Sequence, residues 1–152
     1  MNNFITNLLL IKDQNITMED KLDLINMDGQ DTFVFHGTLS YEPKCCTNCG
    51  CIKEGNNIVK NEFGDPLKVA LLKMSEYPTY LKLKKQRFKC KECHSKFCAE
   101  TSFVQKHSSI SKNLIFYIMK NLSKTLSFKD IAESSNVSVS TVVRVMNSCR
   151  EA

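Results

Sequence analysis

The sequence predicts an α+β protein in which a small β-rich module built around four cysteines is followed by three helices. Two Cys-x-x-Cys pairs, Cys46–Cys49 and Cys90–Cys93, enclose residues 50–89, whose apolar pattern is mostly strand-like. From Ser109 onward, apolar residues recur at helical spacing instead. The change of period between the two parts predicts where strands give way to helices.

Length and charge limit what the chain can be. Its 152 residues, 42% of them hydrophobic, suffice for one ordinary domain or two small ones. Residues 1–43 hold seven acids and two lysines, so their net charge is −5. Because the net charge of the whole chain is +5, the remaining residues carry +10. A basic body behind an acidic leader favours a polyanionic partner.

The eight cysteines are not expected to form disulfides. The first ten residues contain no basic segment, the run Leu8–Ile11 is not followed by a small-residue cleavage site, and no stretch approaches the roughly 20 apolar residues of a membrane span. We therefore expect a cytoplasmic protein without a membrane partner. In a reducing cytosol, paired cysteines bind metal more often than they form disulfides.

The acidic leader, residues 1–43, is expected to contain one short helix and one strand. Apolar residues at helical spacing predict an amphipathic helix over residues 1–12. Residues 13–31 are polar and acidic, which predicts a loop with one helical turn over residues 18–25. The β-branched and aromatic run over residues 33–41 predicts a strand.

The next segment, residues 44–104, is expected to be a zinc-ribbon-like module. Three strands are predicted, over residues 58–63, 68–74 and 79–90, separated by turn-forming Gly and Pro. In the third strand the apolar residues change from odd to even positions. A strand has a period of two, so this change requires a bulge or bend near residues 84–86.

Four thiolates from the two cysteine pairs predict one structural Zn²⁺. The predicted ligands are Cys46, Cys49, Cys90 and Cys93. Two thiolates at this spacing can turn onto one tetrahedral ion, and the second pair completes its coordination. A catalytic ion would need an open position and a neighbouring acid, for which Glu92 is the one candidate. A structural role is therefore favoured.

Other residues near the pairs leave the ligand assignment open. Cys45 and Cys51 flank the first pair, and His94 directly follows the second, so each could substitute for a ligand. The alternative for the cysteines outside the pairs, including Cys98 and Cys149, is an ordinary buried or surface thiol.

The last segment, residues 105–152, is expected to be a three-helix helix-turn-helix domain. Ser127 suits a helix N-cap, with Asp130 completing a capping-box variant. Asn136 tolerates the positive φ that the turn between the second and third helices needs. Ser138 then caps the last helix, whose apolar face is predicted from Val139, Val142, Val145 and Met146.

The outer face of that last helix is the candidate DNA-reading surface. It consists of Ser138, Ser140, Thr141, Arg144 and Asn147. Residues of these types contact base edges and phosphates when a recognition helix enters the major groove. The alternative is a helical hairpin whose polar face is simply solvated.

A basic strand supplies the second group of candidate DNA contacts. The predicted phosphate-binding residues are Lys82, Lys84, Lys85, Arg87 and Lys89. Lys91 and Lys96 continue the run, and Glu92 is the one acid within it. A solvated face is the alternative, but the lack of compensating acids favours contact with phosphates.

The order of these parts resembles the N-terminal region of bacterial insertion-sequence transposases of the ISL3 family. The resemblance is carried by Val34–Tyr41, by Cys46-x-x-Cys49-Gly50, by Tyr80–Cys93, by Phe97 with Ala99-Glu100-Thr101, and by the helix-turn-helix. It implies binding to terminal inverted repeats and supports the four cysteines as zinc ligands. His94 departs from the glycine that usually follows the second pair.

The family's RNase H-like catalytic domain, with three metal-binding carboxylates, would follow Ala152. The chain alone is therefore not expected to be an enzyme or to bind a small-molecule substrate. Double-stranded DNA at transposon ends is the expected partner. Two alternatives stay open: a free-standing repressor or transposition inhibitor derived from a truncated transposase, and a module that self-associates.

Overall fold

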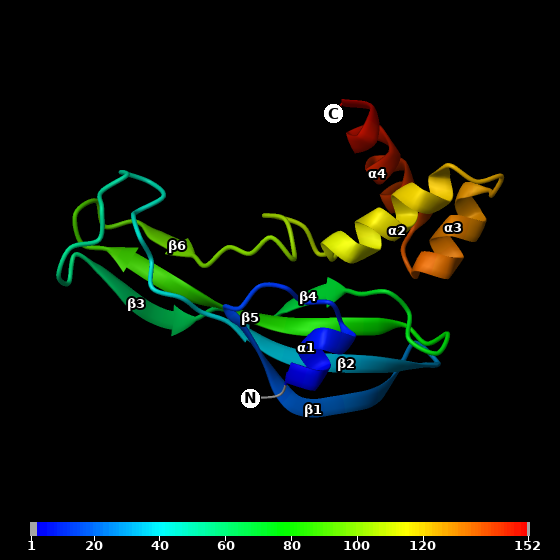
Figure 1. The fold of residues 1–152 in the computed structure, drawn as a ribbon, viewed down its shortest axis with the longest axis horizontal. Helices are drawn as coiled ribbons and strands as arrows, with labels where there is room; N and C mark the ends of the chain where they lie inside the picture. Colours follow the sequence, from blue (N-terminus) through cyan, green and yellow to red (C-terminus); the bar gives the residue numbers. More distant parts are fainter. Residues whose placement is uncertain (1–2, 152) are drawn as a thin grey trace.

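The computed structural model describes residues 3–151, so part of the predicted helix over residues 1–12 and the last residue of the segment 105–152 lie outside the described residues. Figure 1 shows a long sheet with a helical domain above one end. Its elements in chain order are α1 Asn3–Leu8, β1 Ile16–Met27, β2 Gln30–Leu39, β3 Ile58–Phe63, β4 Leu67–Ala70, β5 Thr79–Cys90, β6 Lys96–Cys98, α2 Lys112–Leu122, α3 Phe128–Ser135 and α4 Val139–Glu151.

The central strand of the sheet is β5, which joins two sets of neighbours. Its first part pairs in parallel with β2 and antiparallel with β4. Its second part pairs antiparallel with β3 and β6. The strand order is β1-β2-β5-β3, with β4 and β6 also paired to β5. The boundary predicted between residues 43 and 44 stays a prediction, although β2 of the leader and β5 of the module share this sheet.

The predicted change of face in β5 is confirmed. Leu81 and Leu83 are buried in its first part, whereas Phe88 and Cys90 are buried in its second part. Gln86, which is also buried, lies where the parity changes. Its side-chain amide donates to the carbonyl oxygen of Asn61, which lies in the β3 bulge between Lys60 and Phe63. The buried amide thus satisfies a backbone group that the bulge leaves unpaired.

The predicted loop over residues 13–31 is wrong, because β1 and β2 form an antiparallel hairpin there. The hairpin turns at Asp28-Gly29, where φ is 54° and 82°. Two positive φ values are typical of the type I′ turn, for which Asp-Gly is a preferred pair. That dipeptide was the signal in the sequence. The acidic residues around it obscured the strand, because β1 buries only Ile16 and Met18 and the polar residues beyond them are mostly exposed.

Two predicted elements are shorter than expected. The first helix ends at Leu8, and the chain leaves the helical conformation at Leu10, where φ is 54°. Of the predicted apolar face, Ile5 and Ile11 are buried, whereas Phe4 is 73% exposed. The strand predicted over residues 68–74 ends at Ala70. The other predicted strands, over residues 58–63 and 79–90, are confirmed.

The helices α2, α3 and α4 pack around a core of their own. Its buried residues in the helices are Leu114, Ile118, Ile131, Ala132, Val142 and Val145. The Ser127 hydroxyl accepts a bond from the Asp130 N–H at 3.1 Å, which confirms the N-cap. Asn136 ends α3 with φ 56° and ψ 44°, as predicted for the turn. Val139 does not join the apolar face, since 44% of it is exposed.

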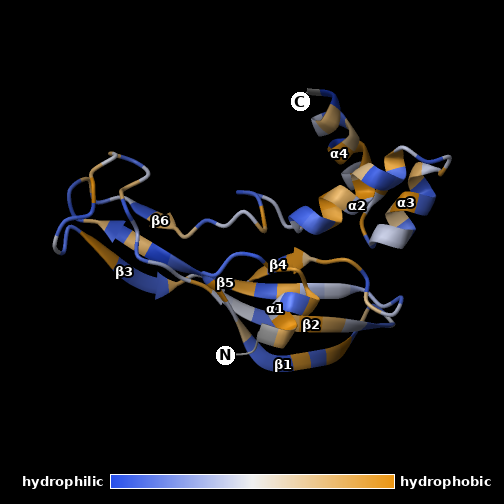
Figure 2. Cartoon of the chain, in the orientation of Figure 1, coloured by the Kyte–Doolittle hydropathy of each residue, from blue (hydrophilic) through white to orange (hydrophobic). Residues whose placement is uncertain are grey.

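The helical domain rests on the sheet through β4 and β5. Ala70 belongs to the helical core, and Tyr80 packs against that core. The Asn136 side-chain amide donates to the Tyr80 hydroxyl at 3.0 Å, and the Ala70 N–H donates to the Ser109 carbonyl at 2.8 Å. Figure 2 shows hydrophobic stretches on α2, α4 and β4. None of the described helices is long and apolar enough to cross a bilayer.

Candidate metal centre and nucleic-acid interface

Each cysteine pair lies in a tight turn, and the second turn begins at the end of β5. In the first turn, the Gly50 N–H donates to the Cys46 carbonyl at 3.0 Å, and Gly50 has a φ of 75°. In the second, the Cys90 N–H donates to the Ser95 carbonyl at 2.9 Å, and His94 has a φ of 62°. Glycine adopts such a φ at no steric cost, whereas histidine does so less readily. The second turn therefore keeps the glycine-type conformation despite the histidine.

The two turns bring the four predicted ligands together. The Sγ atoms of Cys46, Cys49, Cys90 and Cys93 all lie within 4.8 Å of one another. The Cys46–Cys93 and Cys49–Cys90 sulfur pairs are 3.7 and 3.8 Å apart. A tetrahedron with Zn–S bonds of about 2.3 Å has an edge of roughly 3.8 Å, whereas a disulfide needs about 2.05 Å. The geometry therefore fits thiolates around one metal ion and excludes these disulfides.

The surroundings divide the four thiols into two kinds. A backbone N–H of Cys49 lowers the pKa of Cys46, and the Ser95 hydroxyl, with Asn48, lowers the pKa of Cys93 to about 5. Backbone N–H groups of Cys51 and Cys93 favour the thiolates of Cys49 and Cys90, but neighbouring thiols and burial outweigh them and raise both pKa values. Four clustered thiolates repel one another, so a cation is needed to hold all four ionised.

The alternative ligands lie outside this four-sulfur group. The Cys51 sulfur is 3.5 Å from the Cys90 sulfur, but Cys51 is not within reach of all the others. Cys45, Cys98 and Cys149 are exposed free thiols. His94 also lies outside the group. The described residues that could hold a metal by this geometry are thus the four that the spacing predicted.

The candidate reading surface lies on one side of α4. Ser138, Ser140, Arg144 and Asn147 are exposed, and Thr141 is half-buried. The Ser138 hydroxyl accepts a bond from the Thr141 N–H at 3.2 Å and lies 2.9 Å from the hydroxyls of Ser140 and Thr141. Ser138 thus caps the helix at the same end where it presents hydroxyl groups to solvent.

The cations of the basic strand are mostly exposed, and they follow its change of face. Lys82, Lys84, Arg87 and Lys89 are exposed, and Lys85 is half-buried. On the neighbouring strands, Lys68 lies opposite Lys82, and Lys96 lies opposite Lys89. Like charges placed directly opposite each other destabilise a sheet. A bound anion would offset this repulsion.

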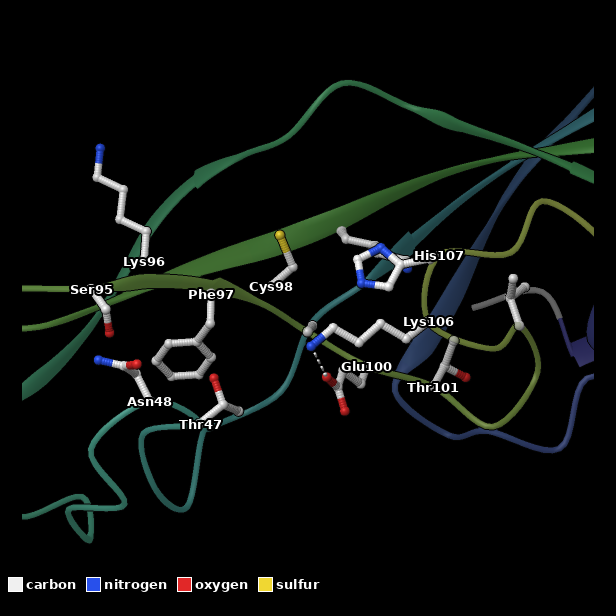
Figure 3. Close-up of a pocket in the computed structure, with 13 residues that line it drawn as sticks. Thr47, Asn48, Ser95, Lys96, Phe97, Cys98, Glu100, Thr101, Lys106 and His107 are labelled. Carbon is white, nitrogen blue, oxygen red and sulfur yellow. Dashed lines mark ion pairs between the residues drawn. The ribbon is translucent and has the colours of Figure 1, made fainter.

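The sequence did not indicate a role for Lys106 and His107, which follow the metal-binding turns in the chain. A cavity of about 600 Å³ lies between those turns and residues 99–107. Figure 3 shows Thr47, Asn48 and Phe97 at one end of it, and Thr101, Lys106 and His107 at the other. Because Lys106 and His107 are isolated in a polar stretch, no charge run or motif marked them.

The four-thiol centre and the helix-turn-helix, which lie at opposite ends of β5, place this protein in the class that joins a metal-binding module to a DNA-binding domain. Within that class, residues 99–149 match the helix-turn-helix domain of transposase family ISL3, which confirms the predicted resemblance for this region. No curated protein and no solved structure matches the chain. The family match indicates that the helical domain binds DNA.

Proposed function

We propose that this protein is a DNA-binding module of an insertion-sequence transposase and recognises the terminal inverted repeats of a mobile element. The match of residues 99–149 to the family's helix-turn-helix domain is the observation that carries the proposal. The exposed cations of β5 support it, because a strand rich in cations suits a phosphate backbone.

In this proposal α4 reads the sequence of the DNA. Its exposed polar face begins at the Ser138 cap and includes Arg144. An arginine can make two hydrogen bonds to guanine in the major groove, and hydroxyl groups can contact bases or phosphates. The cations of β5 supply phosphate contacts that are independent of sequence.

One Zn²⁺ bound by Cys46, Cys49, Cys90 and Cys93 holds the two cysteine turns together. The sulfur separations of 3.7 and 3.8 Å support this role. Four thiolates complete a tetrahedral shell and leave no position for a reacting water, so the ion is structural. By fixing Cys90 at the end of β5, it keeps the basic strand in place.

We also propose that this chain binds DNA without cutting it, because the group of possible metal ligands found among the described residues is the four cysteines and not a set of carboxylates. Incubating the zinc-loaded chain with end-labelled duplex and Mg²⁺ or Mn²⁺ tests this directly. Intact strands are expected. Cleavage by the purified chain would refute the proposal if a variant with impaired DNA binding, purified in the same way, does not cleave the duplex.

Binding to duplex DNA across a salt series tests the main proposal. The zinc-loaded chain should bind a duplex carrying an inverted repeat more tightly than a shuffled duplex of the same composition. Affinity for both should fall linearly with the logarithm of salt concentration, because phosphate contacts release counterions. Equal affinity for the two duplexes, or a flat salt response, would refute it.

A further inference from the structure

Three hollows on the surface meet at one residue, His107. The first is the cavity beside the metal-binding turns, the second lies between α2 and α4, and the third, of about 350 Å³, includes Lys85 and Ser108. His107 lines all three, while Lys106 lines the first two. The hollows therefore adjoin one another, and we call them together the His107 trough.

The trough connects the two parts of the protein that the proposed function assigns to DNA. At one end it is lined by Thr141 and Arg144 of α4. At the other end it is lined by Asn48, beside the thiols, and by Lys96 of β6. The Asn48 side chain lies 3.5 Å from the Cys93 sulfur, so this end is adjacent to the candidate metal centre.

The charge of the trough is strongly positive. Its basic residues are Lys85, Lys96, Lys106, Lys112 and Arg144, in addition to His107. Glu100 is the one acid among the described lining residues. Its carboxylate is 3.7 Å from the Lys106 amine, and both side chains are more than half exposed. Such an exposed pair is weak and can exchange for a stronger anion.

Aromatic rings lie along the same trough. Phe97 lines the end near the metal centre, and Phe116 lines the end near α4 with 54% of it exposed. The Lys112 amine lies 5.8 Å from the centre of the Phe116 ring. Cations that alternate with aromatic rings are typical of grooves that follow a nucleic-acid backbone.

We propose that the His107 trough binds the phosphodiester backbone of a DNA strand as it continues from the bases read by α4 toward the metal centre. This inference rests on the proposed function and names its phosphate-binding path. Lys96, Lys106, His107 and Lys112 are its additional contacts. Glu100 holds Lys106 until a phosphate replaces its carboxylate.

The test uses the full zinc-loaded chain and a duplex selected with it from a random-sequence library. Three probes are compared: the selected core alone, the core with duplex flanks, and the core with single-stranded flanks. The variants are the double substitution Lys96→Gln with Lys106→Gln, and a control with the same charge change, Lys12→Gln with Lys21→Gln. All four lysines are exposed, and metal content and circular dichroism verify folding.

With a flanked probe, the trough variant should have a shallower dependence of log affinity on log salt, by about 2, since each phosphate contact contributes roughly 0.9. When the salt concentration rises from 50 to 200 mM, the affinity of the wild type should therefore fall about ten times more than the affinity of the trough variant. The control should match the wild type. Glu100→Gln should act in the opposite direction and tighten binding, because it frees Lys106. Ethylating the flanking phosphates should weaken the wild type more than the trough variant.

The outcomes separate this inference from the proposed function. If one strand of backbone is sufficient, single-stranded flanks and duplex flanks will both increase affinity. If the trough needs a duplex, only the duplex flanks will increase it. Equal affinity for all three probes, or a trough variant indistinguishable from the control, would overturn the trough while leaving base recognition by α4 intact. Failure to select any duplex would overturn the proposed function and the trough with it.

Discussion

The two ends of this molecule achieve order in different ways. A compact apolar core stabilises the end formed by α2, α3 and α4, where Leu114, Ile118 and Val142 are fully buried. At the far end of β5, the turns carrying the cysteines contribute few buried apolar residues. Two of their four sulfur-bearing residues, Cys49 and Cys93, are not fully buried. Hydrophobic burial thus stabilises the helical end, and we expect the cysteine turns to depend in addition on a bound metal.

Removing the metal should have the largest effect and should separate the two ends. Structural zinc contributes on the order of 10–16 kcal/mol in small modules, more than the roughly 5–15 kcal/mol net stability of a domain. We expect Cys90→Ser to abolish stoichiometric zinc and to unfold the cysteine turns, β3 and β6. Native mass spectrometry measures the metal, and amide hydrogen exchange locates the loss of structure.

Cys98→Ser is the matched control, because Cys98 is exposed and lies outside the four-sulfur group. It should leave zinc content and exchange unchanged. If Cys90→Ser retained its zinc, or if α2 to α4 lost protection to the same degree as the turns, the contrast between the two ends would be wrong.

Truncating the helical core should have the converse effect. Leu114 is fully buried between the helices, so Leu114→Ala should lower the free energy of unfolding of the helical domain by about 2–5 kcal/mol. Urea denaturation followed by circular dichroism measures the change. Zinc content should stay at one ion per chain.

Leu126→Ala provides a comparison on the same domain, since Leu126 is 45% exposed. Its effect on the unfolding free energy should be much smaller. Release of zinc at the denaturant concentration that unfolds the Leu114→Ala helices would show that the two ends unfold together.

Substitutions on α4 and on β5 should affect DNA binding in different ways. Arg144→Ala on α4 should weaken specific binding by about 1–3 kcal/mol and relax the preference for one base. Lys84→Ala on β5 should weaken binding evenly across sequences. Competition with duplexes carrying single-base changes distinguishes the two. Identical profiles for the two variants would contradict the separation of reading and phosphate-binding surfaces.

Removing the helix cap should have the smallest effect. Ser127→Ala removes the hydroxyl that accepts a bond from the Asp130 N–H, and should cost about 0.5–2 kcal/mol of unfolding free energy. Ser134→Ala is the control, because the Ser134 hydroxyl instead donates to the Ile131 carbonyl within the helix. Thermal unfolding measures both, and equal shifts would show that the cap contributes nothing particular.

Local chemistry was sufficient to predict the helical end. Ser127, Asn136 and Ser138 each act within their own turn, so their roles follow from side chains and neighbouring backbone alone. The spacing within each cysteine pair likewise predicted its local turn, whereas the approach of Cys46 to Cys93 joins residues 47 positions apart and depends on the sheet. In β5, the change of parity predicted the change of buried face, since a strand alternates strictly.

The leader was harder to predict because its structure depends on partners far away in the sequence. β1 is rich in acids and has an exposed edge, so composition favoured a loop. Its pairing with β2, which itself pairs with β5 over 40 residues later, stabilises the strand. The Asp28-Gly29 turn was the one local indication of this hairpin.

By itself, the sequence determined the two cysteine turns, the capped helices and the change of buried face in β5, since each depends on contacts within a few residues or on a fixed period. Only the tertiary structure decided that the leader completes the sheet, that Tyr80 and Asn136 join sheet to helices, and that His107 lies where three hollows meet. These features arise from contacts between distant segments, which depend on how the whole chain packs.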